Sequence, residues 1–234
     1  MKFGVVVFPG TWSDRDFGWV IDRVLGQDLR YLWHKDRDLH GVDCVILPGG
    51  FAYGDYLRCG AIARFSPVME SVRDFADHGG LVLGSCNGFQ VLCESGLLPG
   101  ALLRNREGRF VCQWSHLVCE RNDLVFTGLM TVGKPLRIPI SHGQGNYFAD
   151  PATLSRLEQG GQVVFRYSDA EGRVSRGANP NGSVHGIAGL VNAGGNVLGL
   201  MPHPERCAEA GLGGTDGLLL FRSLIEAGLG VLTA

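Results

Sequence analysis

The segment from residue 81 to residue 90 constrains the fold of this chain more than any other. It reads Leu-Val-Leu-Gly-Ser-Cys-Asn-Gly-Phe-Gln, so an apolar run typical of a buried strand leads through a glycine-flanked Cys86 into a helix-compatible segment. This is the cysteine form of the G-x-S-x-G motif, in which a strained strand-to-helix turn holds a nucleophile above an α/β sheet. Glycine suits positions 84 and 88 because the two backbones approach too closely there for a Cβ atom.

Cys86 is the candidate nucleophile. A helix is predicted to begin just after it, and the partial positive charge at a helix N-terminus favours the thiolate over the thiol. The alternative is a buried, inert cysteine in an ordinary turn between strand and helix, because free cysteine is among the most buried residue types. The motif by itself leaves both interpretations open.

The composition fits one globular domain spanning residues 1–234, with 45% hydrophobic and 19% charged residues. The net charge is −2, and no run of Lys and Arg is long enough to predict a nucleic-acid groove. No apolar stretch approaches the length of a membrane span, and the first residues read as a strand rather than a signal peptide. We expect a cytoplasmic enzyme that acts on small molecules, with no nucleic-acid or membrane partner.

The number and spacing of the cysteines also favour a cytoplasmic location. There are seven, an odd number, and no C-x-x-C pair occurs. This argues against a disulfide framework and against a zinc site, and it fits a reducing cytoplasm, so no metal is expected. Four of the cysteines lie in apolar or amphipathic runs and are predicted to be inert core residues, namely Cys44, Cys93, Cys112 and Cys119.

In the first half of the chain, short apolar runs alternate with amphipathic segments, as in a parallel sheet covered by helices. The predicted strands of this half are residues 2–8, 28–33, 43–48 and 81–84. Helical spacing covers residues 17–25, and Ser66 followed by Pro67 predicts the N-cap and first residue of another helix.

From about residue 109 the pattern changes to longer strands suited to antiparallel pairing. The predicted elements are strands at 109–120, 135–141, 162–167, 184–191 and 196–201, followed by a leucine-rich helix at 216–227. This order predicts a single-domain, doubly wound, mostly parallel sheet with helices on both faces and an antiparallel β extension.

Among the seven histidines, His203 is the candidate general base. It stands between two prolines, just after an apolar run, in Met-Pro-His-Pro-Glu-Arg. A residue before proline avoids the helical region, and in an extended chain residues two apart point the same way. Glu205 is therefore predicted to hold one ring nitrogen of His203 while the other faces Cys86, as in a catalytic triad. The alternative is a solvated, proline-rich loop.

Acyl transfer also needs hydrogen-bond donors for the developing oxyanion. In the nucleophile turn, one donor is the backbone N–H of the next residue, here Asn87. The Pro-Gly-Gly-Phe loop at 48–51 is predicted to supply another, because it follows a strand and its glycines let main chain approach a ligand. A plain strand-exit turn is the alternative for this loop.

Three motifs, at 84–90, 48–58 and 201–206, together resemble those of class I (triad-type) glutamine amidotransferases. Within that superfamily the likeness is to glutaminase subunits of phosphoribosylformylglycinamidine synthases, and it covers nearly the whole chain. The resemblance implies a flavodoxin-like core. It also implies that Cys86 is the nucleophile, His203 the base and Glu205 its orienter. Three further residues carry over: Gly50 and Asn87 as oxyanion donors, and Gln90 as a ligand of the substrate glutamine.

Two departures from the family pattern stand out. Gln144, in the segment 139–147, occupies a position where the family usually has Glu, which weakens any claim of a charged contact there. At residues 11–13 the chain reads Thr-Trp-Ser in place of the commoner Ser-Asn-Cys, with no consequence that the sequence reveals.

The resemblance further implies a division of labour. This chain would hydrolyse glutamine to glutamate and ammonia in purine biosynthesis. A large synthetase subunit would use ATP and magnesium to convert formylglycinamide ribonucleotide to the amidine, with a small bridging subunit in many bacteria. This chain has no P-loop, so no cofactor is assigned to it. The alternatives are an amidotransferase subunit of another synthetase, an autonomous cysteine hydrolase of γ-glutamyl amides, and a non-catalytic module with the same fold.

The segments 51–58 and 142–147 are rich in aromatic residues and glycine, and both adjoin predicted strand ends near the nucleophile. Exposed aromatic loops that flank a site often mark an interface, so these segments are predicted to dock the synthetase. Ordinary packed loops are the alternative. The predicted docking residues are Phe51, Tyr53, Tyr56, Arg58, His142, Gln144 and Tyr147.

Overall fold

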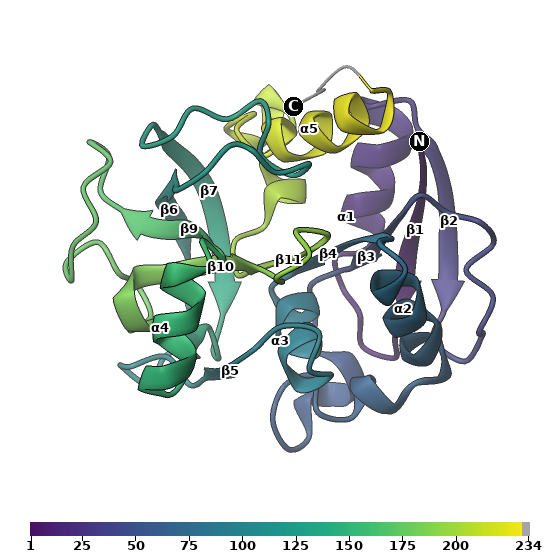
Figure 1. The fold of residues 1–234 in the computed structure, drawn as a ribbon, viewed down its shortest axis with the longest axis horizontal. Coiled ribbons are helices and arrows are strands. Elements are labelled where there is room, and N and C mark those ends of the chain that lie inside the picture. The colour runs from purple at the N-terminus through teal and green to yellow at the C-terminus, as the bar shows by residue number, and fades with distance from the viewer. Residues whose placement is uncertain (231–234) are drawn as a thin grey trace.

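A nine-stranded sheet with the strand order β2-β1-β3-β4-β11-β10-β9-β6-β7 organises the computed structural model, which describes residues 1–230 (Figure 1). The parallel strands are β1 (Lys2–Val7), β2 (Asp28–Trp33), β3 (Cys44–Leu47), β4 (Leu81–Ser85) and β11 (Val197–Leu200). The antiparallel extension consists of β10 (Ile187–Val191), β9 (Val163–Ser168), β6 (Val111–Cys119) and β7 (Pro135–His142). A separate antiparallel pair joins β5 (Ala101–Leu103) to β8 (Asn146–Phe148).

Helices cover both faces of this sheet (Figure 1). On one face lie α2 (Pro67–Asp77), α3 (Asn87–Glu94) and α4 (Pro151–Gln159), and on the other lie α1 (Asp14–Trp19) and α5 (Leu218–Gly228). Each set packs its own hydrophobic cluster against the strands. Along β1, for example, Phe3 and Val5 enter one cluster and Val6 the other, as the two-residue period of a strand requires. The predicted doubly wound sheet with an antiparallel extension is confirmed. The predicted domain of 1–234 stays a prediction, and its residues 231–234 lie outside the described ones.

Three local predictions differ from the structure. The helix predicted at 17–25 changes from α1 into a π-helical turn at Val20–Val24. The strand predicted at 184–191 begins only at Ile187, because His185 has a φ of 53° inside a 3₁₀ turn. Ser66 does stand at the N-cap position of α2, but its hydroxyl pairs with the Tyr53 hydroxyl at 2.9 Å instead of capping the helix.

The cysteine prediction holds for three of the four residues. Cys44, Cys93 and Cys119 are buried, whereas Cys112 is exposed, so its assignment to the core is wrong. The reason is the register of β6: its pairing with β9 covers only residues 116–119, and the earlier half of the strand pairs with β7 alone.

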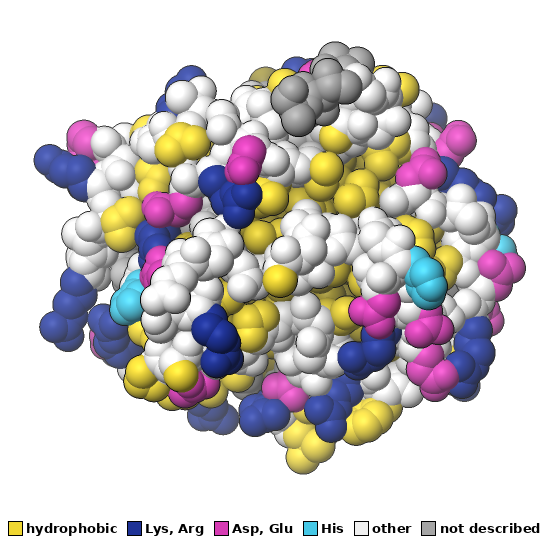
Figure 2. All heavy atoms as spheres, in the orientation of Figure 1, with side chains coloured by type: hydrophobic (Ala, Val, Ile, Leu, Met, Phe, Trp, Pro, Cys, Tyr) yellow, Lys and Arg dark blue, Asp and Glu magenta, His cyan; other side chains and the backbone are white. Residues whose placement is uncertain are grey.

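The outer surface agrees with the small net charge. Figure 2 shows Lys and Arg side chains interspersed with Asp and Glu side chains on the face it presents. Within the described residues, no helix is both long enough and apolar enough to cross a membrane.

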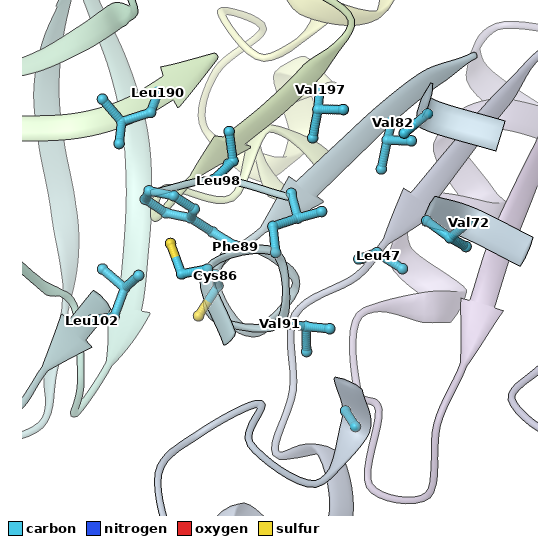
Figure 3. Packing of buried hydrophobic residues seen from close by; sticks show 14 of the residues in the cluster. Leu47, Val72, Val82, Cys86, Phe89, Val91, Leu98, Leu102, Leu190 and Val197 are labelled. Atoms are coloured by element: carbon cyan, nitrogen blue, oxygen red, sulfur yellow. The ribbon is translucent and has the colours of Figure 1, made fainter. Parts of the chain in front are cut away.

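Glycines let α3 lie close to the strand ends. In Figure 3, α3 is viewed nearly end-on inside the buried cluster, with Leu47 of β3 on one side and Leu102 of β5 on the other. A Cβ atom on Gly88 would collide with the carbonyl oxygen of Leu47, and one on Gly84 would lie 2.8 Å from the carbonyl carbon of Gly88. These two positions accept no larger residue without moving the helix away from the sheet.

We expect Gly88→Ala to destabilise the protein by roughly 1–3 kcal/mol, the cost of overpacking a close-packed core. Gly211→Ala is the matched control, because nothing lies within 4 Å of the added methyl group and the backbone there is not left-handed. Urea unfolding followed by circular dichroism measures both free energies. Equal stability of the two variants would show that α3 moves away from β3 without cost.

Candidate active site

The strand-turn-helix predicted from the sequence is present, and Cys86 occupies the turn between β4 and α3. Its backbone has φ 50° and ψ −105°, a region that non-glycine residues rarely adopt. Such strain persists only where surrounding contacts enforce it, and it concentrates at functional sites. Here the Cys86 N–H donates to the Leu200 carbonyl of β11 at 2.8 Å, and the Cys86 carbonyl accepts from the Gln90 N–H at 3.1 Å.

The Cys86 thiol lies where two hollows of the protein meet. It is only 5% exposed, and its Sγ is 3.6 Å from the carbonyl oxygen of Ser141 at the end of β7. The smaller hollow, about 120 Å³, extends toward Gln90 and Asp55. The larger, about 370 Å³, extends toward His203 and Trp12. A ligand in either hollow reaches the sulfur.

His203 and Glu205 form a buried pair at the end of β11. Nδ1 of His203 is 2.6 Å from Oε1 of Glu205, and both side chains are almost fully buried. The second carboxylate oxygen, Oε2, accepts a hydrogen bond from the Ser85 hydroxyl at 3.4 Å. The predicted pairing is present, but an extended chain is not what produces it, because Pro204–Arg206 is a 3₁₀ turn. The turn, and the bond from the His203 N–H to the Pro139 carbonyl, fix the imidazole instead.

The environment of His203 favours the imidazolium. Burial acts to lower the pKa of His203, but the charges of Glu205 and Cys86 outweigh it and raise that pKa to about 10. Nε2 is buried and has no hydrogen-bond partner among the described residues. His203 and Cys86 line the same larger hollow. The arrangement therefore suits a thiolate–imidazolium pair in which Nε2 is free to exchange a proton with a reacting group.

Gly49 and Gly50 bring the loop after β3 against this pair. A Cβ atom on Gly49 would lie 2.7 Å from Cε1 of His203, so only glycine lets the loop pack on the imidazole. Gly50 has a φ of 148°, and a Cβ atom there would lie 2.6 Å from the Trp12 nitrogen. Around Gly50, the ladder bonds are made by the Trp12 N–H to the Gly49 carbonyl and by the Phe51 N–H to the Gly10 carbonyl. This leaves the Gly50 N–H turned away from its neighbour strand and available to a ligand.

The second predicted oxyanion donor is the N–H of Asn87, the residue that directly follows Cys86. Asn87 is the first residue of α3, where helix geometry leaves the backbone N–H without an intrahelical acceptor. Gly50 and Cys86 line both hollows, and Asn87 directly follows Cys86. The two N–H groups thus come from two strand ends that flank the thiol, which is the arrangement an oxyanion hole requires.

The side chains of Asn87 and Gln90 tie three loops together. The Ala52 N–H donates to Asn87 Oδ1 at 3.1 Å, and Asn87 Nδ2 donates to Gln90 Oε1 at 2.8 Å. Gln90 Nε2 then donates to the Gln144 carbonyl at 2.6 Å. Gln90 lines the smaller hollow, so the structure places it beside Cys86, where a substrate ligand is expected.

The predicted docking residues divide into two groups. Phe51, Tyr56 and Arg58 are exposed, and Arg58 also pairs with Glu94 at 2.9 Å. Tyr53 and Gln144 are half-buried.

His142 and Tyr147, however, are 3% and 0% exposed, so the prediction that they form a docking surface is wrong. Asn105 Oδ1 lies 3.1 Å from Nδ1 of His142, and the Tyr147 hydroxyl donates to the Pro99 carbonyl at 2.8 Å. These partners are distant in the sequence and hold both rings inside.

Sequence reasoning missed two features of the site. Trp12 and Phe110 are exposed and line the larger hollow, and the Trp12 ring meets that of Phe51 edge-on at 5.8 Å. A buried amide network around Asn105 and Asn181 anchors the segment after β7, and isolated asparagines carry no motif that reveals it. In residues 1–230, no group of three or more His, Cys, Asp and Glu side chains is placed to hold a metal ion.

The chain matches the family model of the CobB/CobQ-like glutamine amidotransferase domain over residues 1–212. The match covers more than half of the chain, so the chain belongs to this glutamine amidotransferase family.

Its relatives specify the subfamily. The phosphoribosylformylglycinamidine synthase subunit PurQ of Moorella thermoacetica is 58% identical over 97% of this chain and 96% of that protein, and PurQ of Salinibacter ruber is 58% identical over 96% of each. A solved structure of PurLQS from Thermotoga maritima contains a chain that is 41% identical, with a TM-score of 0.85 over 97% of this chain and 98% of that one.

A glutamine amidotransferase from Thermotoga maritima shares the fold at only 18% identity, with a TM-score of 0.55 over 98% of this chain and 92% of that one. The resemblance predicted from the motifs is confirmed. Membership in a family assigns no role to a single residue, so the roles of Cys86, His203 and Glu205 stay predictions.

Replacing Glu205 by Gln should move the alkaline limit of glutamine hydrolysis to lower pH. The charges of Glu205 and Cys86 together raise the pKa of His203 to about 10, and loss of the Glu205 carboxylate lowers that pKa, so the imidazolium disappears earlier as pH rises. The pH–rate profile measures this, with the exposed Glu107→Gln as control. An unchanged alkaline limb in Glu205→Gln, at unchanged thermal stability, would mean that Glu205 does not tune His203.

Proposed function

We propose that this chain is the glutaminase subunit of a phosphoribosylformylglycinamidine synthase, with Cys86 as its nucleophile. The observation that carries the proposal is the meeting of Cys86, the buried His203–Glu205 pair and the Gly50 loop around one pair of hollows. PurQ relatives of nearly the same length support the assignment of the synthase.

The mechanism follows from the positions of these groups. The Cys86 thiolate attacks the side-chain amide carbon of glutamine, and the Gly50 and Asn87 N–H groups donate to the oxyanion that forms. Nε2 of His203 gives its proton to the amide nitrogen, so the carbon–nitrogen bond breaks and ammonia leaves. A γ-glutamyl thioester on Cys86 remains. Water attacks the thioester while His203 accepts its proton, and the carbon–sulfur bond then breaks. Glutamate is released, and the Cys86 thiolate and the His203 imidazolium are regenerated.

Ammonia needs a protected route, because protonation in water removes its nucleophilicity. Delivery inside a complex with a large synthetase subunit satisfies this requirement, and the Thermotoga maritima relative was solved as PurLQS. A small third subunit is expected as well. We assign no cofactor to this chain, and we assign ATP and magnesium to the synthetase. A cytoplasmic location is proposed because all seven cysteines are free thiols and the chemistry needs one of them reduced.

The alternatives differ in what they require of the partner. An autonomous γ-glutamyl hydrolase would work at full speed alone, and an amidotransferase for another synthetase would respond to a different acceptor substrate. The likeness over nearly the full length of PurQ chains favours the purine synthase over both.

Cys86→Ala should abolish glutamine-dependent synthesis by the assembled synthase while added ammonium still supports it. Loss of a covalent nucleophile costs at least about a thousandfold in rate, whereas the synthetase reaction does not use Cys86. Cys112→Ala is the matched control, since that thiol is exposed on β6. Phosphate release and amidine formation are measured with each nitrogen source. Glutamine hydrolysis that survives in Cys86→Ala would exclude Cys86 as the nucleophile.

The isolated subunit should hydrolyse glutamine slowly, and adding the synthetase with its ribonucleotide substrate should raise that rate at least about tenfold, equivalent to about 1.4 kcal/mol of barrier. Tyr56→Ser should weaken this activation, because Tyr56 is 75% exposed in the loop that carries Asp55 into the site. Val132→Ser, near the opposite end of β7, is the control. Full activity of the isolated chain would favour the autonomous hydrolase.

A further inference from the structure

The smaller hollow beside Cys86 contains one carboxylate. Its lining comes from the loop after β3, the start of α3, the end of β7 with the two residues that follow it, and Phe110. Among the described residues that line it, Asp55 is the only acidic one, and no Lys or Arg is present. His142 is neutral there, because burial lowers its pKa to about 4. Apart from Cys86 itself, Asp55 is therefore the one described side chain lining this hollow that carries a formal charge.

Asp55 is unusual in its hydrogen bonding. Its Oδ1 is buried and finds no partner among the described residues, although most buried polar atoms in proteins have one. Burial raises the pKa of the Asp55 carboxyl, and a hydrogen bond with the Cys59 thiol only partly offsets this. A buried, unpaired carboxylate oxygen costs free energy unless a ligand satisfies it.

The backbone of the loop directs this side chain inward. Tyr53, Asp55 and Leu57 all have positive φ values, of 56°, 54° and 66°, in a loop where Gly54 is left-handed as well. Alternating strained residues turn Asp55 inward, while Tyr56 and Leu57 beside it are among the most exposed apolar side chains of the protein. The loop thus points a charge into the hollow and apolar groups outward.

The proposed substrate has a matching charge. Glutamine carries its α-ammonium at the end opposite to the amide that Cys86 attacks. A cation that leaves bulk water for a protein hollow needs an anionic partner to replace its hydration. Gln144 also lines the hollow, but its side chain is neutral and cannot pair with the ammonium as an anion.

We propose that Asp55 binds the α-ammonium of the substrate glutamine through Oδ1 and thereby selects free α-amino acids over other primary amides. The inference rests on the proposed glutaminase function. Asp55 is a specificity residue in this role, since it contacts the substrate away from the reacting atoms. Its ion pair forms on binding and persists through the reaction, so its loss affects KM more than kcat.

The test compares two substrates in the assembled synthase, glutamine and 4-carbamoylbutyrate, which is glutamine without the α-amino group. The wild-type chain should prefer glutamine strongly. Asp55→Asn should raise the KM for glutamine at least about tenfold, as expected for a charge-assisted hydrogen bond, with a smaller change in kcat. The variant should use 4-carbamoylbutyrate as well as the wild type does or better, so the preference for glutamine falls by the same factor.

Two controls keep the outcomes separate. Asp77→Asn removes an exposed carboxylate at the end of α2 and should leave both KM values unchanged. Asp55→Asn with Gln144→Glu returns a carboxylate to the same hollow and should restore part of the preference for glutamine. If Asp55→Asn lowers kcat/KM by the same factor for glutamine and for 4-carbamoylbutyrate, Asp55 only supports the loop and the inference is wrong. A wild-type synthase that cannot hydrolyse glutamine would instead overturn the proposed function.

Discussion

Close packing of α3 against the ends of β3 and β4 is the constraint on which the active site depends. The packing is possible because Gly84 and Gly88 have no Cβ atoms, and Cys86 between them adopts a strained conformation with positive φ. That conformation costs about 1–3 kcal/mol, and the buried side chains of α3 offset it. Figure 3 shows Phe89 of this helix inside the hydrophobic cluster, where it is fully buried. The thiol is therefore held in place by the core rather than by flexible loops.

Two carboxylates at the site, the buried Glu205 and the half-buried Asp55, differ in how their oxygens are bonded. Glu205 has both oxygens bonded by protein groups, His203 and Ser85, so its charge fixes the imidazole before any substrate arrives. Asp55 keeps one buried oxygen without a partner among the described residues. A satisfied charge rigidifies a site, whereas an unsatisfied one makes it depend on a ligand. The protein thus combines a rigid catalytic half with a half whose electrostatics are completed on binding.

Local sequence patterns predicted most of the fold and the residues that the structure brings together at the candidate site. The strands at 2–8 and 81–84 were readable because their apolar runs are continuous, and Cys86, His203 and Glu205 were readable because each lies in a short motif. The sequence did not reveal that His142 and Tyr147 are buried, since contacts with Asn105 and Pro99 decide this.

Other misses had different causes. The helix α4 was not predicted, although its start carried a usable signal. Asp150 is its N-cap and accepts a hydrogen bond from the Thr153 N–H, and Pro151 is its first residue. Its apolar face is short, so the helical spacing is hard to recognise. The positive φ values at residues 53–57 have no signature in the residue types of this loop. The sequence therefore could not predict that the Asp55 side chain lines the hollow.

The position of β11 in the sheet has a consequence for synthesis of the protein. β11 lies between β4 and β10, and its Leu200 pairs with Ser85, a residue made more than a hundred positions earlier. Pairing between strands so distant in the chain forms slowly and only after the intervening segments have emerged. A nascent chain on the ribosome can therefore contain Cys86 before His203 has been synthesised. Because Cys86 follows β4 and His203 follows β11, the strand order lets these two residues meet only after more than a hundred further residues have been made.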